Sequence, residues 1–252
     1  MALTINELPS PNFGPRKAID GQTRVRHLVV HYTGMTPCQK ALDRLRDPKA
    51  EVSAHYVLDE DGTIFRLVAE DMRAWHAGKS FWHGAYDINS TSVGIEIVNP
   101  GHEYGYRAFP DVQIAAFVAL AGDIMQRHRI PAYNVLGHSD VAPGRKTDPG
   151  ELFPWQALST QGIGLWPEET VTLPGHADMT GALRRLSEIG YAVPMTPELG
   201  SDILNAESAV TDVVSAFQGR YRQSRVDGQL DNETATRIAA VAVRFAAARP
   251  AA

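Results

Sequence analysis

The sequence predicts an α/β domain followed by a small domain of three helices. Two observations support the α/β assignment. Short β-branched runs that end in turn residues recur through the first 150 residues, and one long segment of helical periodicity lies between them. A third observation marks the second domain, because beyond about residue 175 the β-type runs stop and apolar stripes at helical spacing follow.

The overall composition excludes several classes of function. The chain has 252 residues, of which 44% are hydrophobic and 21% charged, which is ordinary for a globular protein of one or two domains. A net charge of -5 and a pI near 6.0 offer no broad attraction for nucleic acid or anionic membranes. Since no apolar run approaches the roughly 20 residues that span a bilayer, we expect no membrane insertion.

Three regions of the first domain are predicted to form strands. Residues 25–34 read VRHLVVHYTG, a β-branched run that ends in a Thr-Gly turn. Residues 55–58 and 63–68 are predicted to form a hairpin around an Asp-Gly pair. In residues 92–99, SVGIEIVN, alternate apolar side chains share one face of a strand, so Glu96 points to the other face.

The rest of the first domain contains a long helix and a polar loop. Over residues 111–129, apolar side chains recur at the spacing of one helical face. Residues 134–150, NVLGHSDVAPGRKTDPG, predict a brief strand and then a loop rich in Pro and Gly, which suits the presentation of polar side chains. We place the domain boundary near residue 175, where turn formers replace periodicity, so that the two domains span residues 1–175 and 176–252.

Three apolar stripes predict the helices of the second domain. A domain of about 75 residues is only marginally stable alone, so we expect it to dock on the first domain. The stripes consist of Leu183, Leu186 and Ile189, of Val210, Val213, Val214, Phe217 and Tyr221, and of Ile238, Val241, Ala242 and Phe245.

Two histidines and one aspartate form a candidate metal site. His31 ends the first predicted strand, while His138 and Asp148 bracket the polar loop, so the three side chains could converge on one edge of the sheet. Two imidazoles and one carboxylate are the ligand set of a catalytic zinc that keeps its fourth position for water. Cys38 is the only cysteine, which excludes a Cys-rich zinc site. The alternative is that these side chains only cap a strand end and form a turn.

Five motifs of the first domain resemble, in order, those of the amidase-2 family of N-acetylmuramoyl-L-alanine amidases. They are VVHYTG, SAHYVLDEDG, WHAG, TSVGIEIVN and GHSDVAPGRKTDPG. The resemblance covers roughly residues 20–160 and is closest to the AmpD and AmiD branch, toward which LFPWQAL and GIGLWP extend it. It implies a mixed central β-sheet flanked by helices, with zinc at one edge of the sheet.

The resemblance also implies roles for five residues. His31, His138 and Asp148 match the zinc ligands of the family. Glu96 matches its catalytic glutamate, which takes a proton from the attacking water and passes it to the departing amine. Lys146 matches a lysine that stabilises negative charge on the carbonyl oxygen. The alternatives are a solvent-facing strand carboxylate and a solvated loop lysine.

By the same resemblance, Trp75, His76 and Asn89 line the groove that holds sugar or peptide. An aromatic face suits the apolar face of a sugar ring, and amides suit its N-acetyl group. The alternative places Trp75 in the core and Asn89 in a turn. We expect a structural role for His55 inside the hairpin and a solvated position for Arg145.

The C-terminal segment resembles, more weakly, the three-helix peptidoglycan-binding module. The likeness lies in AFQ, VDG and an acidic-Xaa-ET pattern in family order. Two features depart from the module: PMTPELGSDILNAES replaces the usual first loop, and Asp231-Asn232 replaces a common glycine. Glycan binding and a purely structural role are therefore equal alternatives for this domain.

These observations predict an enzyme that uses zinc to hydrolyse the amide bond between N-acetylmuramic acid and L-alanine in muropeptides, during cell-wall recycling or turnover. The alternative is a metal-free peptidoglycan-recognition protein of the same fold. The absence of a secretory signal from the sequence as given favours the cytoplasm, with the periplasm or cell envelope as the alternative if a signal was removed. All candidate catalytic residues precede Pro149, so residues 1–175 are expected to suffice for the chemistry.

Overall fold

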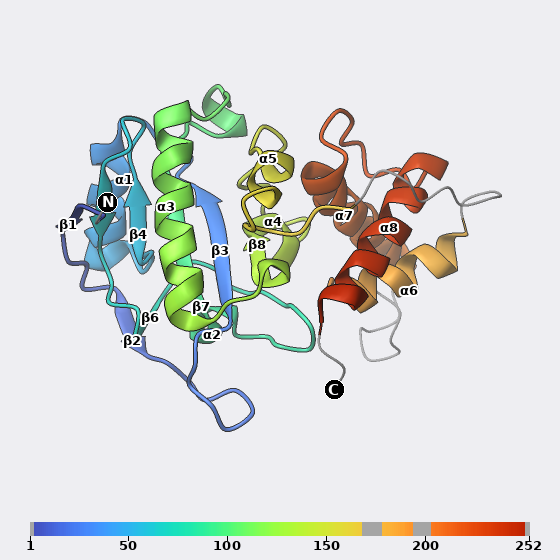
Figure 1. Ribbon diagram of the computed structural model, residues 1–252, viewed down its shortest axis with the longest axis horizontal. Coiled ribbons are helices and arrows are strands. Elements are labelled where there is room, and N and C mark those ends of the chain that lie inside the picture. Colours follow the sequence, from blue (N-terminus) through green and yellow to red (C-terminus); the bar gives the residue numbers. More distant parts are fainter. Residues whose placement is uncertain (1–2, 168–177, 194–202, 250–252) are drawn as a thin grey trace.

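A six-stranded mixed sheet forms the centre of the first domain in the computed structural model, which describes residues 3–167, 178–193 and 203–249 (Figure 1). Its strands, in spatial order, are β1 (Ile5–Glu7), β5 (Ile64–Arg66), β4 (Tyr56–Leu58), β7 (Ser92–Ile97), β3 (His27–Tyr32) and β8 (Val135–Gly137). The β4 and β5 strands pair antiparallel as the predicted hairpin, and the other neighbours in this sheet pair parallel. The predicted mixed sheet is confirmed.

Helix α3 (Asp111–His128) covers one face of this sheet (Figure 1). Because side chains alternate along a strand, only every second residue faces the helix. Val30 of β3 and Ile95 of β7 do so and pack in one buried cluster with Phe117 of α3. The helix ends at Arg129, which adopts the left-handed conformation with a φ of 55°. The helix predicted over residues 111–129 is therefore confirmed.

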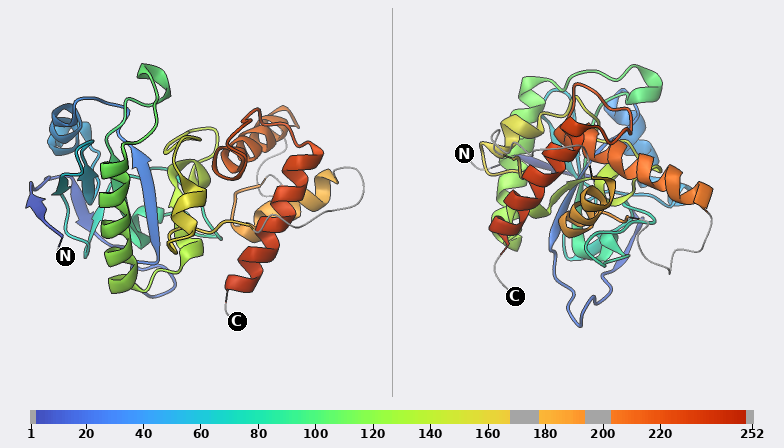
Figure 2. Two further views of the ribbon diagram at one scale, coloured as in Figure 1. Left: turned by 45° about the horizontal axis from the view of Figure 1, so that its top comes forward. Right: turned by 90° about the vertical axis from the view of Figure 1, so that its right-hand side faces the viewer.

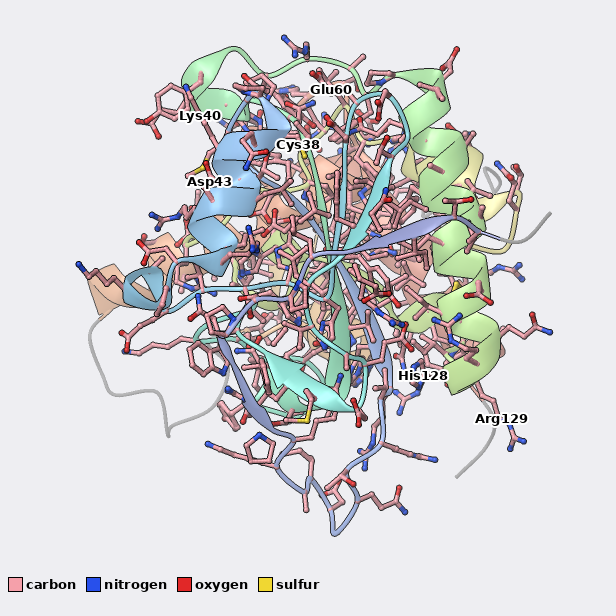
Figure 3. All side chains as sticks on the ribbon, turned by 90° about the vertical axis from the view of Figure 1, so that its left-hand side faces the viewer. Cys38, Lys40, Asp43, Glu60, His128 and Arg129 are labelled. Carbon is pink, nitrogen blue, oxygen red and sulfur yellow. The ribbon has the colours of Figure 1, made fainter. Side chains whose placement is uncertain are left out.

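Helix α1 (Cys38–Arg46) covers part of the opposite face. Figure 3 shows Cys38 turned toward the sheet, where it packs in a cluster with Val57 of β4, while Lys40 and Asp43 point outward. The remaining elements of this part are β2 (Phe13–Pro15) and β6 (Met72–Ala74), which pair antiparallel, the helices α2 (Ile88–Thr91), α4 (His138–Val141) and α5 (Trp155–Ser159), and the 3₁₀ turns Pro48–Ala50, His102–Tyr104 and Ala132–Asn134.

The polar loop predicted directly after β8 begins instead with the single helical turn of α4. The Asp140 carboxylate accepts a hydrogen bond from the backbone N–H of Gly137 at 2.8 Å and so satisfies a donor at the start of this turn. The backbone N–H of Ala142 donates to the carbonyl of His138 at 3.0 Å and closes the turn. His138 is therefore held by a helix rather than by an irregular loop.

The three predicted C-terminal helices are present as α6 (Met179–Ile189), α7 (Ile203–Tyr221) and α8 (Asn232–Ala248). Figure 1 and the left view of Figure 2 show them gathered on one side of the molecule, and Figure 1 shows α7 next to α4 and α5. The boundary predicted near residue 175 lies outside the described residues. No helix in the described part of the chain is long and apolar enough to cross a membrane.

The C-terminal helices share their hydrophobic core with the sheet. Trp82, Ile88 and Leu136 from the first domain pack in the same buried cluster as Leu186 and Phe217 from the helices. The expectation that the helices dock on the first domain is confirmed, and their apolar stripes face the sheet as well as one another.

Candidate active site

The predicted metal ligands lie on the face of the sheet opposite α3. His31 is the fifth residue of β3 and pairs in register with Glu96 of the neighbouring parallel strand β7. Since Val30 and Ile95 face α3, both His31 and Glu96 point the other way. Strand alternation thus places a candidate ligand and a candidate base side by side.

His31, His138 and Asp148 meet in a tight triangle. The Nδ1 atoms of the two histidines lie 2.9 Å apart, and Asp148 Oδ2 lies 3.1 Å from His31 Nδ1 and 3.0 Å from His138 Nδ1. Each of the three residues is at most 5% exposed. The convergence predicted from their positions in the sequence is therefore present in the structure.

A hydrogen-bond relay determines the tautomer of His31. The Ser92 hydroxyl donates its proton to the Ile88 carbonyl at 2.6 Å, so its oxygen accepts from Nε2–H of His76 at 3.1 Å. His76 Nδ1 is then an acceptor for Nε2–H of His31 at 3.0 Å. Burial, together with the nearby His138, lowers the pKa of His31 to about 4, so its imidazole is neutral near pH 7 and its Nδ1 carries a lone pair.

The same tautomer follows for His138 from its backbone contact. Its Nε2 atom lies 3.1 Å from the Ala77 carbonyl oxygen, which can only accept, and this contact is shorter than the 3.4 Å approach of Arg145 Nη2. Nε2 therefore carries the proton and Nδ1 a lone pair. Two imidazole lone pairs and a carboxylate oxygen consequently face one another at about 3 Å, an arrangement that fits a shared divalent cation.

The negative charge of Asp148 also suits a site that holds a divalent cation. Burial by itself raises the pKa of its carboxyl group, but positive charge and hydrogen bonds from the adjacent imidazoles, when these carry a proton on Nδ1, outweigh burial and hold the pKa well below its usual range. A cation bound to the same three atoms would act in the same direction while both imidazoles stay neutral. Asp148 is thus an anion in the buried triangle, which a bound cation would neutralise.

Asn89 does not line the groove as predicted. It is 4% exposed, and its side-chain oxygen accepts the backbone N–H groups of His76 at 3.0 Å and Ala77 at 2.8 Å. These bonds fix the segment that carries His76 and the Ala77 carbonyl. The predicted contact of Asn89 with sugar or peptide is therefore corrected. Asn89 supports the backbone of the site, because its side-chain oxygen already accepts two hydrogen bonds inside the protein.

Gly94 of β7 makes room for His76. A Cβ atom at this position would lie 2.5–2.7 Å from the His76 ring, closer than real side chains approach. Ser92, Gly94 and Glu96 occupy alternate positions of one strand, so they share the face that carries the site. This alternation could have revealed the roles of Ser92 and Gly94 from the sequence.

Glu96 has the environment of a proton carrier. Its Oε2 atom is buried and has no hydrogen-bond partner among the described residues. Burial and the charge of Asp148 raise the pKa of Glu96 well above its usual value, and the charge of Lys146 acts in the opposite direction. A carboxylate with a raised pKa and a free oxygen suits proton transfer near neutral pH.

A cavity of about 410 Å³ opens over the metal triangle. Lys146 is exposed at its edge, and Trp75 and His76 also border it, as predicted for the groove. Its lining includes Tyr32, Thr33, Arg44, Ser53, Trp75, His76, Glu96, His138, Arg145, Lys146 and Asp148.

Arg145 and His55 both make hydrogen bonds that support the site. Arg145 stays exposed, as expected of a solvated loop residue, but it donates from Nη2 to the carbonyl oxygens of Ala77 at 2.5 Å and Lys79 at 2.8 Å. Through these bonds to backbone carbonyls, Arg145 connects two loops that border the groove. His55 is fully buried, and its Nδ1 accepts the Gly94 N–H at 2.9 Å, which confirms its structural role.

A polar network that the sequence did not reveal holds the segment carrying Lys146 and Asp148. The Tyr32 hydroxyl lies 2.9 Å from Thr147 Oγ1 and 3.0 Å from His102 Nδ1. His102 Nε2 in turn lies 2.9 Å from Glu151. His102 belongs to a loop without periodicity, so no pattern in the sequence pointed to this contact.

Comparison with known proteins agrees with the geometry. Residues 21–151 match the family model described as N-acetylmuramoyl-L-alanine amidase. The chain is 37% identical over 241 residues to N-acetylmuramoyl-L-alanine amidase AmiD of Escherichia coli, covering 87% of this chain and 83% of that protein. It is 39% identical over 190 residues to 1,6-anhydro-N-acetylmuramyl-L-alanine amidase AmpD of Citrobacter freundii, covering 69% of this chain and 93% of that protein.

Two solved structures extend the likeness to the whole fold. The AmiD complex from E. coli superposes with a TM-score of 0.77 at 35% identity, over 90% of this chain and 91% of that one. AmpDh3 from Pseudomonas aeruginosa gives a TM-score of 0.78 at 32% identity, over 91% of this chain and 96% of that one. With the five ordered motifs and the ligand triangle, these matches establish that the chain belongs to the amidase-2 family of N-acetylmuramoyl-L-alanine amidases.

Proposed function

We propose that this chain uses zinc to hydrolyse the amide bond between N-acetylmuramic acid and L-alanine in muropeptides. The observation that carries the proposal is the convergence of three buried acceptor atoms, from His31, His138 and Asp148, beside a glutamate whose Oε2 has no partner among the described residues. Nitrogen and oxygen donors in this ratio suit catalytic zinc.

The substrate class is proposed from the relatives. The AmiD structure is a complex with the substrate anhydro-N-acetylmuramic acid-L-Ala-D-γ-Glu-L-Lys, and AmpD is named for the 1,6-anhydro form of the sugar. We therefore propose 1,6-anhydro muropeptides as the first substrates to test, in a pathway of wall recycling or turnover.

In the proposed reaction, the residues of the site have three separate roles: holding zinc, transferring a proton and stabilising negative charge. Zinc held by His31, His138 and Asp148 would polarise the scissile carbonyl and make water a stronger acid. Glu96 takes the proton of the attacking water and delivers it to the amine of L-alanine as that amine leaves. Lys146, exposed at the edge of the cavity, stabilises the negative charge that develops on the carbonyl oxygen.

Trp75 is proposed to contact the substrate, because it borders the cavity and offers an aromatic face for a sugar ring. His76 also borders the cavity, but both of its ring nitrogens are engaged, with His31 and with Ser92. We therefore assign its main role to orienting His31.

The test is incubation of the purified chain with defined muropeptides, analysed by mass spectrometry with and without a chelator. The expected products are the free sugar and the intact peptide, formed only while zinc is bound, with about one zinc per chain by elemental analysis. Peptide binding without cleavage by a metal-free protein would contradict the proposal and favour a recognition protein. Parallel assays of intact sacculi and 1,6-anhydro muropeptides would identify the preferred substrate.

A further inference from the structure

A buried carboxylate next to the metal site obtains its counter-charge from the C-terminal helices. Asp140, which is 1% exposed, accepts a hydrogen bond from Arg220 Nη1 at 2.5 Å and another from the Tyr191 hydroxyl at 2.6 Å. Arg220 lies on α7 and is 4% exposed, and Tyr191 follows α6. Both partners belong to the C-terminal part of the chain, beyond residue 177.

Asp140 belongs to the element that holds the metal ligand His138. Helix α4 has four residues, starts at His138 and is far too short to be stable by itself. Asp140 Oδ2 caps it through the Gly137 N–H, and the same oxygen is the one that Arg220 holds. Whatever fixes this carboxylate therefore fixes the first turn of α4.

Arg220 also holds the strand that leads into α4. Its Nη2 donates to the carbonyl oxygen of Val135 in β8 at 3.0 Å, and its guanidinium lies 4.2 Å from the centre of the Trp155 ring. One side chain of α7 thus contacts the elements on both sides of the β8–α4 junction, where His138 lies. The buried side chains leave this contact little freedom to relax.

Arg222, two residues further along the chain and just past the end of α7, provides a natural contrast. It is also 4% exposed, but its charged partners are Asp231 and Glu233, and it bonds to Thr234. All of these partners belong to the C-terminal part. The C-terminal end of α7 and the residue after it therefore provide two equally buried arginines, Arg220 bonded to the first domain and Arg222 bonded within the C-terminal part.

We propose that Arg220, supported by Tyr191, is a positioning residue of the metal centre, which makes the C-terminal helices part of the catalytic unit. It acts through Asp140 by holding the turn that presents His138 to the metal. The inference rests on the proposed zinc site, but it is independent of any glycan binding by these helices.

The test compares Arg220→Gln with Arg222→Gln in the full-length chain. Zinc affinity is measured by chelator competition, the ligand geometry by the absorption spectrum of the Co²⁺-substituted protein, and folding by thermal unfolding with and without metal. We expect R220Q to weaken zinc binding about tenfold, as changes in the residues that support metal ligands do, and to alter the Co²⁺ spectrum. R222Q should lower the melting temperature while leaving zinc affinity within about twofold of the wild type.

Two further variants keep the test decisive if R220Q folds poorly. Tyr191→Phe removes one hydrogen bond from Asp140 with little change in volume and should weaken zinc binding in the same direction. Adding Asp140→Asn to R220Q removes the uncompensated buried charge and should restore part of the lost stability.

Equal zinc affinities and Co²⁺ spectra for R220Q, Y191F and R222Q would overturn the inference and leave Arg220 a purely structural residue. A wild-type chain that bound no zinc would overturn the proposed function and this inference together. A zinc-loaded, active wild type that showed no difference between the arginine variants would overturn the inference alone.

Discussion

At the scale of single residues, the proposed metal site depends on side chains that are not among its candidate ligands. Ser92 orients His76, His76 orients His31, and the Ala77 carbonyl orients His138. In each case Nε2–H of the imidazole donates, so His76 Nδ1 accepts from His31, and the Nδ1 lone pairs of His31 and His138 face Asp148. Mutation of residues that support metal ligands in this way commonly lowers metal affinity or activity 10–100-fold, an effect that approaches that of mutating a catalytic residue.

Replacement of Ser92 by alanine tests this relay. We expect Ser92→Ala to weaken zinc binding by up to about tenfold, because His76 loses the acceptor that fixes its tautomer. Thr91→Ala is the matched control, since the adjacent Thr91 hydroxyl contacts the buried His27, away from the ligand triangle. Chelator competition measures both variants, and equal affinities would contradict the relay.

Glu96→Gln tests the proton carrier. The substitution preserves shape but removes basicity, so zinc should be retained while turnover falls by at least about 100-fold. Elemental analysis and steady-state kinetics on a muropeptide provide the two readouts. Glu188→Gln on the exposed side of α6 is the control and should behave like the wild type. Near-normal turnover of E96Q would show that a group other than Glu96 carries the proton.

At the scale of elements, close packing between strand β7 and the His76 segment shapes the site. We expect Gly94→Ala to weaken zinc binding and to lower the free energy of unfolding by roughly 1–3 kcal/mol, because the added methyl group would displace the His76 ring. Gly122→Ala in α3 meets no atom within 4 Å and should be neutral or stabilising by up to about 1 kcal/mol. Denaturant unfolding and zinc competition measure the pair.

A second element-scale contact joins the C-terminal end of α3, where Figure 3 labels His128, to the sheet. Burial alone would raise the pKa of Glu70, but hydrogen bonds from His128, Tyr56 and Arg127 outweigh it and lower the pKa to about 2. A carboxylate with a lowered folded-state pKa stabilises the fold above its unfolded pKa of about 4.3. That contribution is lost as the pH falls from about 4 toward 2.

Glu70→Gln should therefore lower the free energy of unfolding at pH 7 by about 2 kcal/mol, and the difference from the wild type should shrink as the pH falls below about 4. Glu7→Gln removes a half-exposed ion pair with Arg66 and should cost no more than about 1 kcal/mol. Urea unfolding between pH 3 and pH 7 provides the comparison. A pH-independent effect of E70Q would show that the ionised carboxylate is not its cause.

At the scale of the whole molecule, the shared core joins the C-terminal helices to the sheet. AmpD of C. freundii aligns over 93% of its own length but only 69% of this chain, so about a third of this chain has no counterpart there. In this protein the C-terminal helices bury Leu136 and supply the counter-charge of Asp140. The expectation that residues 1–175 suffice for the chemistry is untested. The proposed role of Arg220 predicts instead that such a truncation weakens zinc binding, and the shared core adds a stability cost.

The cluster shared by the sheet and the C-terminal helices, which lies on the face of the sheet opposite the α3 cluster, predicts one cooperative unfolding transition. Phe217→Ala in α7 and Leu120→Ala in α3 should each lower the melting temperature of the same transition, by roughly 10 °C for a cavity costing about 3–4 kcal/mol. Calorimetry measures the effect, with the calorimetric and van't Hoff enthalpies expected to agree. Two separate transitions, with only one affected by F217A, would instead indicate an independent C-terminal domain.

The sequence by itself determined the main elements around the site and indicated the candidate ligands. Local periodicity predicted β3, the β4–β5 hairpin, β7, α3 and the C-terminal helices, because burial of one face leaves a pattern of period 2 or 3.6. Ordered motifs identified His31, His138, Asp148 and Glu96, since each lies within a short stretch whose residue types are constrained by the chemistry.

Only the tertiary structure decided how distant residues support one another. Asn89 accepts backbone N–H groups of another segment, the exposed Arg145 donates to backbone carbonyls of a second loop, and Asp140 pairs with Arg220 eighty positions away; none of these contacts has a local signature. The physical reason is that buried polar atoms must find partners wherever the packed chain brings them, so their bonds depend on the completed fold. Periodicity reports which face of an element is buried, whereas these partnerships exist only after the sheet, α4 and α7 have come together.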